Sequence, residues 1–234
     1  MKGKIIAFFI VAAFLAGLNT YAAQDKEENR SVGKFNALGL SISADVEISQ
    51  GSETELILIG DPATLENIKT VVEGGKLKIK YDKSWPTRFK KVKVLITSPN
   101  WEGIAVAGSG TVRNVTPIQE SELNLAVSGS GLIKLDQLVS DDVSAKISGS
   151  GDIQISGSKS ASKLGVAISG SGDVDASEFK VDKVTVKISG SGDASVYAES
   201  RLEVTVSGSG DVSYYGNASV DARISGSGNV RKRD

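Results

Sequence analysis

Residues 184–192 read Val-Thr-Val-Lys-Ile-Ser-Gly-Ser-Gly, a short alternating run that ends in a glycine-rich tripeptide. Apolar side chains recur at every second position, which is typical of a β-strand with one buried face. The tripeptide Gly-Ser-Gly occurs seven times along the chain, at successive spacings of 21, 20, 21, 20, 18 and 18 residues. Each copy follows an alternating run, so the chain is a repeat protein with a unit of 18–21 residues.

Each tripeptide is followed by a second, shorter strand pattern, as in Ile153 and Ile155 or Val174 and Ala176. One unit cannot bury its own apolar face, whereas stacked units bury a continuous apolar column. The predicted fold class is therefore all-β, a right-handed parallel β-helix (β-solenoid) with a Gly-Ser-Gly corner in each rung. The right-handed sense follows from the general preference of parallel crossovers.

The paired glycines are predicted to form one corner of every rung. Glycine adopts positive φ at little steric cost, and identical glycines allow neighbouring corners to lie close together. The serines between them are expected to form a ladder of hydroxyls along the stack. The predicted corner glycines are Gly108, Gly110, Gly129, Gly131, Gly149, Gly151, Gly170, Gly172, Gly190, Gly192, Gly208, Gly210, Gly226 and Gly228.

Acidic or amide residues follow five of these corners. Asp152, Asp173, Asp193, Asp211 and Asn229 are interpreted as turn residues, because Asp and Asn bond their own backbone in turns. A calcium site at the four stacked carboxylates is the alternative. Calcium-binding nonapeptide solenoids carry more glycine and aspartate than these units do. We therefore expect turn residues, with no bound metal and no cofactor.

The first 23 residues are predicted to be a signal peptide. Lys2 and Lys4 precede an unbroken apolar run of 11 residues, Ile5 to Leu15, and small residues follow it. Spanning a bilayer needs about 20 residues, so no transmembrane segment is expected after cleavage. The rest of the chain is divided into a flexible stretch at 24–31, irregular N-terminal rungs that cap the solenoid at 32–103, and the repeat solenoid at 104–234.

The region 32–103 lacks Gly-Ser-Gly but carries several strand patterns. Asp61-Pro62 predicts the N-cap and first position of a short helix at about 62–70. Gly74-Gly75 predicts a tight turn between two strands. A small separate β domain is the alternative to capping rungs. Strands are predicted at 40–49, 54–60, 76–81 and 92–97.

The composition excludes several kinds of site. The chain has no cysteine and no histidine, which removes disulfides, thiolate ligands and the commonest general base. With 27 basic and 28 acidic residues, it lacks the basic excess that is typical of nucleic-acid binding. The acidic residues of the array recur with the repeat, and none forms a unique catalytic pair. The sequence thus predicts a non-enzymatic protein that does not bind nucleic acid.

Three tyrosines of the array are candidate ligand-binding residues. Tyr197 and Tyr215 hold the same offset after Gly192 and Gly210, so they are expected to stack on adjacent rungs. With Tyr214 they would form an aromatic strip that a sugar ring or a peptide could cover. The alternative is that one tyrosine points inward and the stack only stabilises the coil.

A second candidate group lies in the loop between two predicted strands. Trp85, Arg88 and Phe89 combine aromatic and basic side chains there. Binding residues gather on such loops, and aromatic and arginine side chains are typical anchors of binding interfaces. The alternative is that Trp85 and Phe89 fold back and cover the end of the solenoid.

The repeated Ser-Gly-Ser-Gly-Asp/Asn-Val units after a leader resemble the bacterial head GIN domain family of auto-transporter adhesins. The stretches Val-Gly-Lys-Phe (32–35), Val-Glu-Ile-Ser-Gln-Gly (46–51) and Gly-Lys-Leu-Lys-Ile (75–79) are also similar to that family. The resemblance covers about residues 32–230. It implies a right-handed β-helix and an exported location, and it supplies no catalytic residues.

We therefore expect an exported, non-enzymatic adhesin that makes multivalent contacts along a rigid rod. Its expected partner is a glycan or a cell-surface protein, and its expected location is the periplasm, the cell surface or the medium. Two alternatives stay open. One is a periplasmic scaffold or envelope-stress partner, and the other is a carbohydrate-active enzyme.

Overall fold

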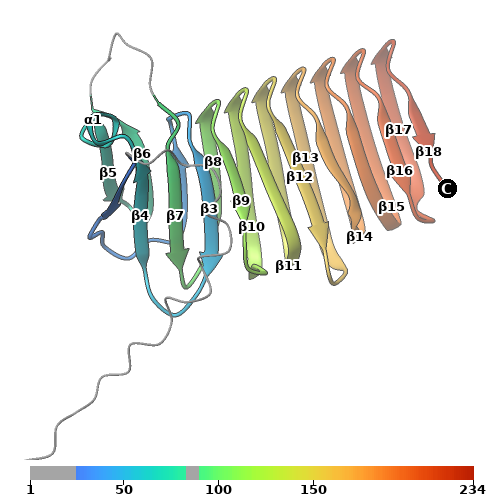
Figure 1. The fold of residues 1–234 in the computed structure, drawn as a ribbon. Helices are drawn as coiled ribbons and strands as arrows, with labels where there is room; N and C mark the ends of the chain where they lie inside the picture. Colours follow the sequence, from blue (N-terminus) through green and yellow to red (C-terminus); the bar gives the residue numbers. More distant parts are fainter. Residues whose placement is uncertain (1–24, 83–89) are drawn as a thin grey trace, which may run out of the picture.

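The computed structural model describes residues 25–82 and 90–234. It is 69% strand and 2% helix, and it forms a β-solenoid of about 6 turns (Figure 1). The predicted all-β solenoid is confirmed. Within the described residues, no helix is long and apolar enough to cross a membrane. The predicted signal peptide, residues 1–23, lies outside the described residues.

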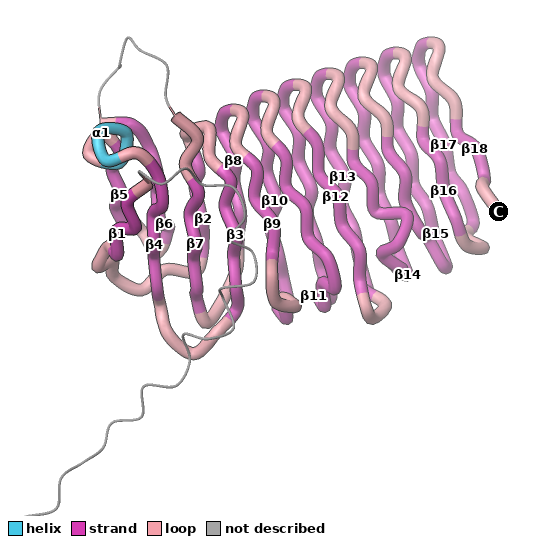
Figure 2. The backbone as a smooth tube through the Cα atoms, in the orientation of Figure 1, coloured by secondary structure: helices cyan, strands magenta, loops and turns pink. Residues whose placement is uncertain are grey.

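The repeat region forms two parallel sheets that face each other across the core (Figure 2). Three long strands, β11 (Leu132–Gly149), β14 (Val174–Gly190) and β15 (Ala194–Gly208), pass from one sheet to the other. Sheet A contains their C-terminal parts with β8 (Gly103–Gly108), β10 (Gln119–Gly129), β13 (Ala161–Gly170) and β17 (Ser219–Gly226). Sheet B contains their N-terminal parts with β9 (Thr111–Asn114), β12 (Asp152–Gly157), β16 (Val212–Tyr215) and β18 (Val230–Lys232).

The first glycines of all seven corners lie in one row at the end of sheet A. Gly129 pairs with Gly108 and with Gly149, and this pairing continues in register to Gly226. The N–H of each corner serine from Ser130 onward donates to the carbonyl of the preceding rung's first glycine, at 2.8–3.0 Å. The corner serines are exposed. The hydrogen-bonded ladder thus runs through the main chain and not through the predicted hydroxyls.

The two glycines of a corner are required for different reasons. The first glycine has φ between +124° and +150°, a region that favours glycine. The second glycine has no such φ, but from Gly131 onward a Cβ there would lie closer than 3.0 Å to the carbonyl oxygen of the second glycine one rung earlier. The main chains of neighbouring rungs therefore approach too closely at this corner to admit a side chain.

The first rungs continue both sheets. β2 (Ala37–Leu40) pairs in parallel with β8, and β3 (Asp45–Gln50) pairs in parallel with β9. Two further parallel strands, β6 (Lys76–Tyr81) and β7 (Lys93–Ser98), lie on the other side of β2 and β3. The stack then ends in antiparallel strands, β4 (Glu55–Gly60) on β7, β1 (Lys26–Asn29) on β4 and β5 (Ile68–Glu73) on β6.

This N-terminal part shares its core with the array. One cluster of buried side chains runs from Phe35 to Val212. Trp101 is fully buried in it, packs edge-on against Phe35 and donates its indole N–H to the Ser49 carbonyl at 3.0 Å. The region therefore consists of irregular rungs that are continuous with the solenoid.

The strands predicted at 54–60, 76–81 and 92–97 are confirmed as β4, β6 and β7, but the strand predicted at 40–49 is wrong. It is two strands, β2 and β3, separated by a corner at 41–44. Leu40, Ile42 and Ala44 are all buried, so the alternation of apolar residues runs straight through this corner. No glycine marks the bend, and the pattern could not reveal it.

The predicted helix at 62–70 is a single turn, α1 (Pro62–Leu65). Asp61 is its N-cap, as predicted, and accepts a hydrogen bond from the Thr64 N–H at 3.2 Å. The chain then enters β5, because the β-hairpin with β6 takes over from Ile68. Gly74 and Gly75, with φ of +58° and +75°, form the predicted tight turn of that hairpin.

The stretch predicted to be flexible, 24–31, contains a strand. Lys26–Asn29 forms β1 and pairs antiparallel with β4. Arg30 then donates to the Leu65 carbonyl at 2.8 Å and to the Ile68 carbonyl. The side chains of this stretch are largely exposed, so charged residues are tolerated there. The pairing of β1 with β4 is made by the main chain.

The last rung differs from the others in burial. Val220 and Ile224 of β17 continue the inward-facing apolar pattern, yet they are 37% and 41% exposed. Equivalent residues of earlier rungs, such as Leu202 and Val206, are buried. The difference arises because no later strand of the described chain covers β17.

A half-buried ion cluster joins the first rungs. Glu47 on β3 lies 3.0 Å from the Lys93 ammonium of β7 and is also paired with Arg113 of β9. Burial alone would raise the pKa of Glu47, but the hydrogen bonds from Arg113 and Lys93 outweigh it and hold the pKa below its ordinary value. The ionised carboxylate therefore links three neighbouring strands.

The pH dependence of stability should reveal this cluster. A lowered pKa adds stability at neutral pH that is lost as the pH falls through the ordinary glutamate pKa, about 4.3, and below. We expect Glu47→Gln to be less stable than wild type at pH 7, with a difference that shrinks toward pH 3. Urea unfolding of both proteins across this range measures the difference, and a constant gap would contradict the assignment.

The corner contacts predict opposite effects for one substitution at two glycines. Gly172→Ala places a Cβ against the Gly151 carbonyl. It should lower the free energy of unfolding by about 2 kcal/mol, as overpacking in a core does. The Cβ added by Gly165→Ala, in the middle of β13, meets nothing within 4 Å, so this variant should raise the free energy of unfolding by about 0.5–1 kcal/mol. Urea midpoints of the two variants test this, and equal midpoints would refute the steric account of the corner.

Candidate functional site

The interior of the solenoid is filled by side chains, so a ligand must bind to an outer face or a corner. Sheet A and sheet B present outward-facing residues at the same register in successive rungs. Exposed serines occupy two rows along the glycine corner. The outer surface of the protein is therefore periodic.

The predicted stack of tyrosines is present on sheet B. Tyr197 pairs with Tyr215 on the next rung, and their rings are nearly parallel, at 14°, with centroids 6.5 Å apart. The Lys180 ammonium lies over the Tyr197 ring, 5.5 Å from its centroid. One face of Tyr197 thus meets a cation and the other meets Tyr215.

Tyr214 lies apart from this strip. It pairs with Val196, a buried residue of sheet B, and packs partly buried against the core. Adjacent residues of a strand point to opposite faces, so Tyr214 and Tyr215 cannot share one outer surface. The structure brings together two of the three predicted tyrosines, and it adds Lys180, which the sequence did not single out.

Trp85, Arg88 and Phe89 lie outside the described residues. A hollow of about 310 Å³ borders the strands beside this loop and is lined by Asp45, Lys90 and Lys91, among others. Its cations are paired: Lys91 with Asp45 at 2.5 Å and Lys90 with Asp61 at 2.7 Å. The hydrogen bond from Lys90 lowers the pKa of Asp61, and Asp61 raises the pKa of Lys90.

The aspartates after the corners form a ladder along the axis. The carboxylate of Asp152 accepts from the N–H of Asp173 at 3.1 Å, and Asp173, Asp193 and Asp211 accept in the same way from Asp193, Asp211 and Asn229 at 2.7–2.9 Å. The interpretation as residues that bond their own turn is therefore wrong, because each carboxylate bonds the next rung. Among the described residues, no group of three or more acidic side chains could hold a metal ion.

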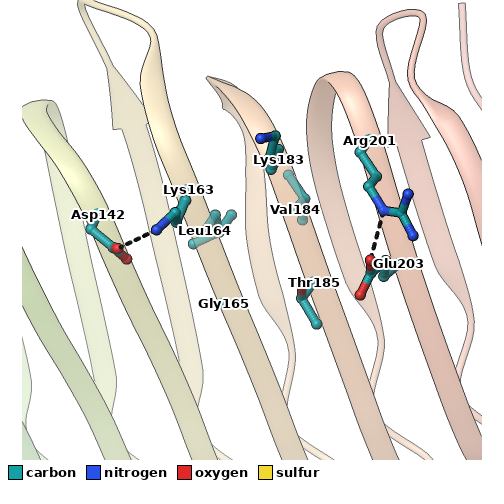
Figure 3. Close-up of a pocket in the computed structure, with 9 residues that line it drawn as sticks. All are labelled: Asp142, Lys163, Leu164, Gly165, Lys183, Val184, Thr185, Arg201 and Glu203. Atoms are coloured by element: carbon teal, nitrogen blue, oxygen red, sulfur yellow. Dashed lines mark hydrogen bonds and ion pairs between the residues drawn. The ribbon is translucent and has the colours of Figure 1, made fainter.

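A second hollow, of about 300 Å³, lies on the outer face of sheet A (Figure 3). Gly165 of β13 lines it, together with Lys163, Lys183, Thr185 and Glu203, among others. Figure 3 shows Lys163 extending toward Asp142, and Arg201 turned onto Glu203.

Sequence reasoning missed this hollow, although a signal existed. The residues that pair with Gly165 on the adjacent rungs are Ser144 and Thr185, so a polar side chain is expected at this position. Glycine weakens a strand, and inside a strand it often marks close approach by a ligand or another backbone. Aligning the rungs by their corners would have shown glycine at this position in two rungs, at Gly103 and Gly165, and polar side chains in the rungs between and after them.

The ladder predicts different outcomes for two substitutions of one aspartate. Asp193→Asn keeps the acceptor for the Asp211 N–H and removes one charge from a row of like charges, so stability should be equal or slightly higher. Asp193→Ala removes the acceptor and should cost about 1 kcal/mol. Urea midpoints of both variants at low ionic strength measure these effects. A lower midpoint for Asp193→Asn, with no loss in Asp193→Ala, would reject a purely structural ladder.

Comparison with solved structures identifies similar folds. A "putative adhesin" from Bacteroides fragilis NCTC 9343 has a TM-score of 0.84 at 22% identity, over 91% of this chain and 98% of that one. A "putative lipid binding protein" from Parabacteroides distasonis ATCC 8503 has a TM-score of 0.75 at 24% identity, over 91% and 98%. A "putative adhesin" from Parabacteroides merdae ATCC 43184 has a TM-score of 0.70 at 20% identity, over 91% and 97%. At these identities the likeness shows the fold alone.

Comparison with curated protein sequences gave no significant match. A family model does match, over residues 34–218, from the first rungs into the last part of the array. This range includes six of the seven Gly-Ser-Gly corners and the hollow at Gly165. The resemblance predicted from the repeats is thereby confirmed, and the chain belongs to the family described as "Putative auto-transporter adhesin, head GIN domain".

Proposed function

We propose that this chain is an exported, non-enzymatic protein of the adhesin type, which binds a glycan or a cell-surface protein through its outer faces. The family to which the chain belongs is described as an auto-transporter adhesin family, which supports a binding role and a place outside the cytoplasm. The apolar leader predicted at residues 1–23 supports export. The absence of histidine and cysteine from the sequence supports a non-enzymatic role.

One observation carries the proposal: outward-facing residues keep the same register from rung to rung. The rows of sheet A run in register from Gly108 through Gly226, and Tyr197 stacks on Tyr215 in sheet B. Strands of one sheet lie about 4.8 Å apart, so equivalent side chains form a regular array. Such an array suits a repeating polymer, because several weak contacts act together at high effective concentration.

A periplasmic scaffold and a carbohydrate-active enzyme would each require other features of the molecule. A periplasmic scaffold would use the same rigid faces but would never meet an external ligand. A carbohydrate-active enzyme would require a specific pair of carboxylates, one to protonate the leaving group and one to act as base or nucleophile. The aspartates after the corners are engaged in a structural ladder, which favours binding over hydrolysis.

Protease shaving of intact cells tests the location. An adhesin at the surface should be cleaved or released from intact cells, together with a known surface protein and without a periplasmic marker. Protection until the outer envelope is opened would favour the periplasmic scaffold and would contradict the adhesin assignment.

Substitutions of the tyrosine stack test the binding face. In a glycan-array and cell-binding assay with the purified chain, the double variant Tyr197→Ala/Tyr215→Ala should lose at least about tenfold in affinity, or 1.4 kcal/mol. The matched control, Tyr197→Phe/Tyr215→Phe, keeps both rings and should lose less than half of that free energy. Trp85→Ala tests the loop in the same assay.

Circular dichroism and urea midpoints establish that each variant is folded. Unchanged capture by both the double alanine variant and Trp85→Ala would discard these residues as binding residues. Hydrolysis of a captured polysaccharide by the wild-type chain would overturn the non-enzymatic assignment.

A further inference from the structure

The hollow at Gly165 has no structural explanation within the strand. Gly165 does not have a positive φ, and a Cβ added there would meet nothing within 4 Å. The ladder on both sides of it is regular, with Ser144 and Thr185 as direct partners. A strand-interior glycine costs about 0.5–1 kcal/mol relative to alanine. The glycine therefore lowers stability without serving a turn, a bulge or a close contact in this chain.

The side chains around Gly165 are unusually cationic. Lys163, Lys183 and Arg201 occupy the same register position on three successive strands of sheet A. Like charges directly opposite each other destabilise a sheet. The two preceding rungs carry Glu122 and Asp142 at this position, so the charge of the row changes sign at the hollow.

These cations are incompletely paired. Lys183 has no ion-pair partner among the described residues. Lys163 lies 3.9 Å from Asp142, beyond hydrogen-bonding distance, with its side chain 66% exposed. Arg201 is paired with Glu203 through Nε at 2.6 Å. In contrast, the hollow beside Lys90 and Lys91 has both of its cations in close ion pairs. The Gly165 hollow is thus the better anion site.

The other side chains that line the hollow indicate which further groups a ligand should carry. Thr185 and Glu203 line the hollow beside the cations. A carboxylate accepts up to about four hydrogen bonds, so Glu203 retains acceptors for ligand hydroxyls while it holds Arg201. A simple anion such as phosphate would be repelled by Glu203. A ligand that carries both a negative charge and hydroxyl donors would satisfy every group.

We propose that the hollow at Gly165 binds a carboxylate-bearing sugar unit of an acidic polysaccharide. The sugar carboxylate lies against Lys183 and Lys163, its hydroxyls meet Glu203 and Thr185, and its ring lies over the bare main chain of Gly165. The volume of about 300 Å³ is at the lower end for ligand pockets, which suits one sugar unit of a longer chain. The inference rests on the proposed binding role and is independent of cellular location.

Isothermal titration calorimetry of the purified chain with α-1,4-linked trigalacturonate tests the proposal. Wild type should bind the acid at least about tenfold more tightly than the methyl ester of the same trimer, and salt should weaken the binding. Gly165→Val fills the hollow and should cost about tenfold or more in affinity. Its control, Ala167→Val, places the same side chain two residues along the same face and should change affinity less than about twofold.

Charge variants locate the site. Lys183→Gln should weaken binding about fivefold or more, whereas Lys134→Gln removes one positive charge from sheet B and should leave affinity within about twofold. Gly165→Val should also unfold at equal or higher urea than wild type, because valine favours strands. Loss of affinity in that variant therefore reports a filled site and not an unfolded protein.

Three results would overturn the proposal. The first is equal affinity for the trimer and its methyl ester. The second is an equal loss of affinity in Lys134→Gln and Lys183→Gln. The third is displacement of the trimer by sodium sulfate at the same concentration, which would indicate a general anion site. Unchanged cell binding by the tyrosine variants would discard the tyrosine face and leave this proposal standing, since the tyrosine stack lies on sheet B and the hollow on sheet A.

Discussion

The spacing of the repeat array depends on the contact between glycine backbones at one corner. From Gly131 onward, the carbonyl oxygen of each corner's second glycine stands where a Cβ of the next rung would lie. Main-chain hydrogen bonds at 2.8–3.0 Å then connect corner to corner. Because every corner is held in the same register, the strands on both sheets are held in register as well. The aspartate ladder, the tyrosine stack and the apolar core all follow from that alignment.

The parts of the fold that could be predicted from the sequence are those where a residue type fits only one local structure. The repeated glycines, the Gly74-Gly75 turn and the Asp61 cap belong to this class. The predictions were wrong where a local pattern is shared by two structures. Leu40, Ile42 and Ala44 alternate identically through a corner and a strand, and β5 replaced a helix because its pairing with β6 depends on residues distant from the helix signal.

The candidate site was less predictable for a related reason. A repeat predicts which residues align, so the stack of Tyr197 on Tyr215 could be derived from their offsets. It does not predict which faces of the rings stay open, and Lys180 covers one of them. Nor does it assign the ladder of carboxylates to the next rung, since the same aspartates fit an ordinary turn. Those contacts depend on the distance between rungs, which only the structure supplies.

Periodicity also separates the residues that build the rod from those that give it a specific surface. A side chain that recurs in every rung, such as a corner glycine, is explained by stacking. Gly165 does not recur in every rung: its register position holds Gly103 in one earlier rung and polar side chains in the rungs next to it. It has no steric role, and it lies beside a row of three cations. Stability would be higher with a β-branched residue there, as in Thr185 one rung later. A departure that lowers stability and opens a charged hollow is better explained by recognition of a ligand than by folding.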